Sequence, residues 1–113
     1  MAAVNAYQSL VADAARPGYF PSAHLELAYF GLGEALRGQR HFAEAAQAYE
    51  QAAFTQGSGA ELKRRSLVAA GKARDLNGER ALAVKDYQWA IANGSDTTQG
   101  EIARRLLKTP YHE

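Results

Sequence analysis

Several residue types and patterns are missing from this 113-residue chain. It has no cysteine, which excludes a disulfide framework, a thiolate nucleophile and a cysteine-based zinc site. Its net charge is only +1, so we expect no nucleic-acid partner. No stretch is long and apolar enough to span a membrane, and the N-terminus lacks the basic and apolar regions of a signal peptide. These absences predict a cytoplasmic location, unless the chain is a fragment of a longer protein.

The residue constellations that carry catalysis or hold a cofactor are also absent. His24, His41 and His112 show no metal-ligand spacing, and there is no nucleophile–base pair, phosphate loop or HExxH motif. We therefore expect no catalytic residue, no metal and no cofactor, and we predict that the protein is not an enzyme.

What the sequence does contain is hydrophobic periodicity of the helical kind, with no strand-like alternation. Glycine, asparagine and proline divide this pattern into about six helices, over approximately 2–15, 22–37, 41–55, 59–76, 79–92 and 98–108. Ser58 and Thr98, each followed three residues later by glutamate, predict capping boxes for the fourth and sixth helices. The chain therefore predicts an all-α domain of antiparallel helical hairpins.

One packing pattern occurs twice, centred on glycines at positions 33 and 71. The two copies are Tyr29-x2-Leu32-Gly33-x2-Leu36 with Ala45-x3-Tyr49, and Leu67-x2-Ala70-Gly71-x2-Arg74 with Ala83-x3-Tyr87. This arrangement resembles the tetratricopeptide repeat (TPR), a helix–turn–helix unit of about 34 residues. The resemblance implies a single domain, 1–113, in the form of a right-handed α–α superhelix. Its parts would be an unpaired N-terminal helix (1–16), two repeats (22–57 and 59–95) and a C-terminal capping helix (98–108).

The two glycines of the repeat stand inside predicted helices, where glycine costs about 1 kcal/mol relative to alanine. That cost predicts a neighbouring helix that crosses so closely that no Cβ fits. The second copy departs from the family pattern at Arg74 and Arg80, where the first copy has Leu36 and Phe42. We expect these two arginines to weaken the second repeat.

In the TPR family, ligands commonly lie in a concave groove lined by the first helix of each repeat. The resemblance carries this role to four residues in each repeat of this chain: Leu27, Phe30, Glu34 and Arg37, then Arg65, Val68, Lys72 and Asp75. A family mode that grips a C-terminal carboxylate with lysine and asparagine is not expected, because those positions hold Phe30, Glu34 and Ala69.

Trp89, the only tryptophan, is a candidate secondary contact. It follows Leu82 by two helical turns, so the two share a helix face distinct from the packing seam. We expect the sixth helix to cover Trp89 through Ile102 or Leu106; the alternative is an exposed binding anchor. The basic clusters 63–65 and 104–105 are expected to lie on solvated helix faces.

By the resemblance, the function is protein–protein interaction: a scaffold or adaptor that binds a peptide or protein partner in the groove. Two alternatives stay open. One is a self-assembling, homo-oligomeric module, and the other is an accessory domain of a larger enzyme or of a secretion or assembly protein.

Overall fold

The computed structural model describes residues 4, 5, 8, 22–55 and 59–113. These residues form five helices and no strand: α2 (Ser22–Gly38), α3 (Phe42–Phe54), α4 (Ala60–Leu76), α5 (Arg80–Ala92) and α6 (Thr98–Lys108). The predicted all-α class is confirmed, and the last five predicted helices are found close to their expected bounds. The helix predicted over 1–16 lies almost wholly outside the described residues, although Val4 is helical and is buried in the same core cluster as Leu32 and Leu36.

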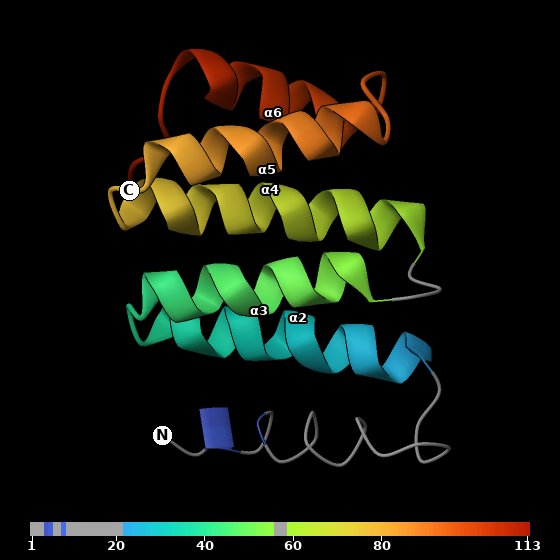
Figure 1. Cartoon of the computed structure of the whole chain (residues 1–113), viewed down its shortest axis with the longest axis vertical. Helices are drawn as coiled ribbons and strands as arrows, with labels where there is room; N and C mark the ends of the chain where they lie inside the picture. Colours follow the sequence, from blue (N-terminus) through green and yellow to red (C-terminus); the bar gives the residue numbers. More distant parts are fainter. Residues whose placement is uncertain (1–3, 6–7, 9–21, 56–58) are drawn as a thin grey trace.

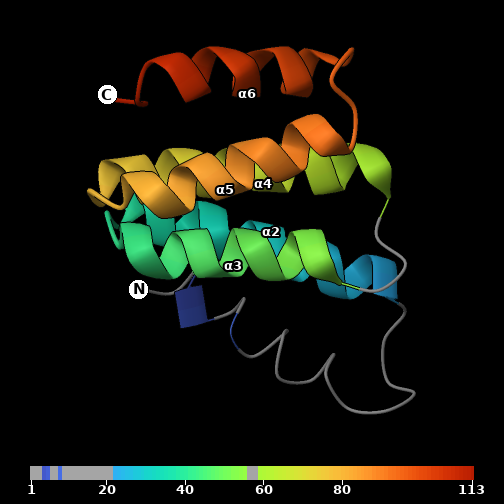
Figure 2. The same ribbon diagram turned by 45° about the horizontal axis from the view of Figure 1, so that its top comes forward.

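The helices stack as a ladder, from α2 near the bottom to α6 at the top, and consecutive helices run in opposite directions (Figure 1). Figures 1 and 2 both place each helix beside the next, and the closest packing joins α3 to α2 and α4. The α4–α5 turn and the last residues of the chain lie on the same side of the stack, at the left in Figures 1 and 2. Within the described part, every helix is too short or too polar to cross a membrane.

The turn that joins α2 to α3 and the turn that joins α4 to α5 share one geometry. Each contains a residue with left-handed backbone, Arg40 (φ 63°) and Gly78 (φ 74°). The N–H that follows each of them donates to the carbonyl five positions back, at 2.9 and 2.8 Å. The second helix ends at Gly38, one residue beyond its predicted end, and Arg40 makes the reversal. Arginine adopts this conformation at a steric cost that glycine avoids.

The glycines of the repeated pattern pack directly against its tyrosines. A Cβ added at Gly33 would lie 2.7 Å from Cδ1 of Tyr49, and one added at Gly71 would lie closer still to the ring of Tyr87. Both tyrosines are completely buried. The prediction that no Cβ fits is therefore confirmed, and the group that excludes it is an aromatic ring from the second helix of the same hairpin.

Most of the core consists of alanine, packed as two clusters around the two tyrosines. The first cluster lies among α2, α3 and α4, and the second among α3, α4, α5 and α6. Alanine buries little area for each residue but lets helix axes approach closely. The half-buried side chains of α6 close the second cluster from above: Ile102, Leu106 and Leu107.

The helix N-termini differ in detail from the predicted capping boxes. The N-cap of α6 is Thr97 rather than Thr98, and its hydroxyl accepts the N–H of Gly100 at 3.0 Å. The N-cap of α4 is Gly59, which supplies no side-chain cap. Ser58, the predicted cap, lies outside the described residues.

Candidate functional site

The predicted groove residues lie on α2 and α4, the first helices of the two hairpins, and we call this surface the α2–α4 face. Leu27, Glu34 and Arg65 are exposed on it, Phe30, Arg37 and Lys72 are half-buried, and only the backbone of Asp75 is exposed. Val68 differs from the prediction, because it is only 2 % exposed and belongs to the second core cluster. It can support this surface from beneath but cannot line it.

One end of the α2–α4 face is built around Phe30. Its ring lies 5.4 Å from the ring of Tyr49, edge to face, which fixes it against the first core cluster. The guanidinium carbon of Arg65 lies 5.2 Å from the centroid of the Phe30 ring. This cation–π contact joins α4 to α2 across the two hairpins. Leu27, one turn before Phe30 on α2, is 57 % exposed beside them.

The hydroxyl groups of the two buried tyrosines reach polar partners on the same face. Tyr49 donates to Oε1 of Glu34 at 2.6 Å, and Tyr87 donates to Oδ2 of Asp75 at 2.7 Å. Burial has the largest effect on the pKa of each tyrosine and the adjacent carboxylate the next largest, and both raise it well above its ordinary value. Both hydroxyls therefore remain donors over the whole physiological pH range.

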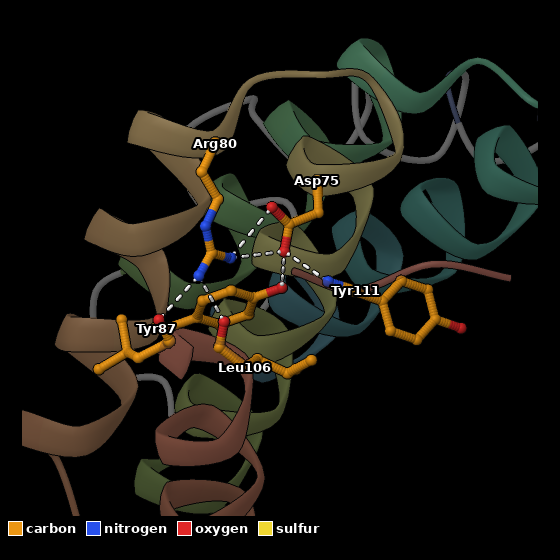
Figure 3. A network of polar contacts seen from close by, with 6 residues as sticks. Asp75, Arg80, Tyr87, Leu106 and Tyr111 are labelled. Atoms are coloured by element: carbon orange, nitrogen blue, oxygen red, sulfur yellow. Dashed lines mark hydrogen bonds and ion pairs between the residues drawn. The ribbon is translucent and has the colours of Figure 1, made fainter. Parts of the chain in front are cut away.

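Asp75 is the centre of a polar network at the other end of the α2–α4 face (Figure 3). Its carboxylate accepts hydrogen bonds from Tyr87, from Nη1 of Arg80 at 3.0 and 3.2 Å, and from the backbone N–H of Tyr111 at 3.0 Å. The side chain of Asp75 is only 1 % exposed. Asp75, predicted to line the groove, is therefore already engaged by the protein itself.

The chain beyond α6 crosses this end of the face through Tyr111. Nη2 of Arg37 donates to the Tyr111 hydroxyl at 3.1 Å, and Nζ of Lys72 lies 5.1 Å from the centre of the ring. Two positions on, the carboxylate of Glu113 pairs with Arg40 at 3.3 Å. The pKa of Lys72 is lowered mainly by burial and, to a smaller extent, by the charge of Arg37. Two cations from different hairpins thus converge on one aromatic side chain.

Arg80, expected to weaken the second repeat, instead fastens α6 to the rest of the fold. Its Nη2 donates to the carbonyl oxygen of Leu106 at 2.8 Å, as Figure 3 shows, and to that of Leu107 at 2.9 Å. These carbonyls belong to the last turn of α6, where a helix leaves its acceptors free and attracts positive charge. Where the first repeat has the apolar Phe42, Arg80 on α5 therefore forms hydrogen bonds to α4 and to α6.

Arg74, the other departure from the repeat, is buried between the hairpins and fully paired. Its Nη2 and Nε donate to the two carboxylate oxygens of Glu50 at 2.7 and 3.2 Å, and its Nη1 donates to Glu79 at 3.0 Å. Asp86 completes the group; burial and the hydrogen-bonded, negatively charged Glu50 raise its pKa to about 9. The sequence signal for this network was Arg74 at an apolar position, but only the fold brings its partners together.

Trp89 corrects a prediction, because α6 does not cover it. Its side chain is 51 % exposed, and its ring meets the equally exposed ring of Phe54 edge to face, with centroids 5.6 Å apart. The apolar side chains of α6 pack on the Tyr87 cluster instead. Phe54 and Trp89 therefore form a surface pair on α3 and α5; an exposed Trp89 was the alternative prediction from the sequence, without Phe54.

The residues of the two basic clusters point to separate partners. On α4, Lys63 lies 5.9 Å from the centre of the Phe54 ring, Arg65 lies on Phe30, and Arg64 donates to the carbonyl of Asn93 at 2.9 Å. On α6, Arg104 donates to the carbonyl of Ser95. The two clusters therefore contact several different parts of the fold.

The side chains of the α2–α4 face meet one another through aromatic rings, cations and hydrogen bonds. Among the described residues, no group of three histidine or acidic side chains is placed to hold a metal ion. The sequence matches no protein-family model, and comparisons with curated proteins and with solved structures find no significant match. The TPR resemblance therefore remains a prediction.

Proposed function

We propose that this chain is a protein–protein interaction module that binds an extended peptide or protein segment along the α2–α4 face. The observation that carries the proposal is the contact of Arg65 with Phe30, which joins the first helices of two hairpins into one surface. Exposed Leu27 extends that surface by one helical turn. Aromatic and arginine side chains of this kind are enriched at the centres of protein interfaces.

The internal repetition supports a TPR-like superhelix as the scaffold of this module. The glycine–tyrosine contact and the left-handed turn both recur at equivalent positions of the two hairpins. In a right-handed stack of such hairpins, the first helices would share one surface. A fold alone does not determine a function, so the proposal depends on the side chains of that surface.

The test compares the partners captured by the wild-type protein with those captured by Phe30→Ala/Arg65→Ala. Lys85→Ala, an exposed change on α5 outside the α2–α4 face, is the matched control. We expect the double variant to lose partners that the wild type and the control retain, while all three proteins give the same circular dichroism spectrum. The same set of partners for all three proteins would reject this face as the binding surface.

Self-association is a second candidate, favoured by the exposed pair Phe54 and Trp89 together with Leu82, which is also exposed. Two large rings in contact at the surface are unusual unless another surface covers them. Light scattering over a hundredfold range of concentration tests this candidate. A rise in mass that Trp89→Ala abolishes would support it, and a constant monomer mass would exclude it.

A further inference from the structure

Residues 109–113 leave the end of α6 and run back toward α4, as Figure 1 shows, and their side chains extend as far as α2. Their contacts use a backbone N–H, a tyrosine side chain and a carboxylate, which a separate peptide could also supply. A backbone N–H meets Asp75, a phenol ring lies against Lys72, and its hydroxyl accepts from Arg37. A carboxylate two positions later meets Arg40. These groups define a tyrosine followed, two positions on, by an acid.

The segment is attached by these polar contacts rather than by burial in the core. Tyr111 is its only half-buried residue, and the other four are exposed. A hollow separates the segment from α6; it is lined by Arg105, Leu106, Lys108, Thr109, Pro110, Tyr111 and His112. Releasing the segment would therefore expose little apolar surface. Apart from Asp75, the residues that it contacts are half-buried (Arg37, Lys72) or exposed (Arg40). This is the composition of a reversible contact.

We propose that residues 110–113 are an intramolecular ligand of the α2–α4 face, and that a partner peptide with tyrosine followed two positions later by an acid displaces them. This inference rests on the proposed function, because it uses the same face. It concerns the end at Arg37, Lys72 and Asp75, whereas the proposed function depends on the end at Phe30 and Arg65.

A tethered ligand acts at an effective concentration on the order of millimolar. A free peptide therefore competes poorly with the segment in the wild-type protein and binds well only when the segment is disabled. Tyr111→Ala disables it by removing the ring and the hydroxyl, while the backbone N–H that serves Asp75 remains. Because Tyr111 lies outside the helices and the core clusters, we expect the variant to stay folded.

The experiment titrates full-length proteins into a fluorescein-labelled peptide with the sequence of residues 108–113 and follows fluorescence anisotropy. We expect Tyr111→Ala to bind the peptide at least about tenfold more tightly than the wild type. Adding Arg37→Ala should abolish this gain, and adding Lys85→Ala should leave it unchanged. A control peptide with alanine in place of tyrosine should not bind. Equal affinity for wild type and Tyr111→Ala, or no saturable binding to Tyr111→Ala, would overturn the proposal.

The two proposals can fail separately. If Tyr111→Ala gains the peptide but Phe30→Ala/Arg65→Ala loses no partner, the intramolecular ligand is upheld and the wider binding surface is rejected. If the double variant loses partners but Tyr111→Ala gains no peptide, the reverse holds.

Discussion

Replacing Gly33 by alanine is expected to destabilise the protein by about 1–2 kcal/mol, although alanine is the better helix former. The reason is the ring of Tyr49. The new methyl group would lie 2.7 Å from Cδ1, 2.8 Å from Cε1 and 3.0 Å from Cγ, well inside normal carbon–carbon contact. The ring cannot retreat easily, because Tyr49 is fully buried and its hydroxyl is held by Glu34 at 2.6 Å.

The magnitude follows from two opposing effects. Overpacking a tight core costs about 1–3 kcal/mol, and the immobile ring places Gly33 in the upper part of that range. Alanine recovers about 1 kcal/mol through its higher helix propensity and the smaller entropy of its unfolded chain. The difference leaves a net loss of about 1–2 kcal/mol, equivalent to a fall in Tm of roughly 4–10 °C for a chain of this size.

The assay is urea denaturation followed by circular dichroism, with Gly38→Ala as the matched control in the same helix. A Cβ added at Gly38 meets no heavy atom of the described residues within 4 Å, so that variant should be as stable as the wild type or more stable. In a Tyr49→Leu background, the penalty at Gly33 should shrink or change sign. If Gly33→Ala is as stable as Gly38→Ala, the glycine–tyrosine contact does not limit the packing and the reasoning fails.

Three further predictions concern Tyr49, Asp86 and Trp89. Tyr49→Ala should lower the free energy of unfolding by about 3–5 kcal/mol, and Tyr49→Phe, which loses only the hydrogen bond, by about 1 kcal/mol; equal losses in urea denaturation would contradict this. Asp86 has a folded pKa of about 9, above its unfolded value, so its contribution to stability is full below about pH 4 and is lost as the pH rises through 9. The free energy of unfolding of Asp86→Asn should therefore rise relative to that of the wild type between pH 5 and pH 9, by at most about 1.4 kcal/mol per pH unit. If the two proteins differ in melting temperature by the same amount at every pH, the raised pKa of Asp86 is refuted. Iodide should quench the fluorescence of Trp89 strongly, because half of its side chain is exposed, and a shielded emission would contradict the exposed pair with Phe54.

The helical class and the lack of room for a Cβ at two glycines were predictable, because both follow from local periodicity and residue size; that tyrosine rings fill this room was not. Glycine inside a helix is unfavourable unless something prevents a side chain, so its presence alone indicated a close contact at Gly33 and Gly71. The conformations of the turns were harder to predict from the sequence. Nothing in the side chain of Arg40 indicates a left-handed conformation, whereas Gly78 signals one through its residue type.

The polar networks could not be predicted, because their partners come from helices far apart in the sequence. Arg74 pairs with Glu50, 24 residues earlier, and Arg80 reaches carbonyl groups 26 and 27 residues later. The repeat pattern alone predicts that both arginines weaken the second hairpin. In the fold they join neighbouring hairpins and helices, which an apolar residue could do only by packing.

Position-by-position comparison of the first helices shows how packing determines the charge of the α2–α4 face. When Gly33 is aligned with Gly71, Glu34 corresponds to Lys72 and Arg37 corresponds to Asp75, so the order of the charges is reversed. Each buried tyrosine needs an acceptor for its hydroxyl; Glu34 supplies it in the first hairpin and Asp75 in the second.

In each hairpin, one carboxylate accepts a hydrogen bond from the buried tyrosine, and a cation lies beside it on the α2–α4 face. These cations are Arg37 and Lys72, and both meet Tyr111. Arg65 adds a third positive charge farther along the face. In a chain with a net charge of only +1, this face thus holds three cations next to two carboxylates, Glu34 and Asp75, that accept hydrogen bonds from the buried tyrosines. On the proposal that residues 110–113 occupy this face, its cations would favour acidic, aromatic peptides, and residues 111–113 are an example of that composition.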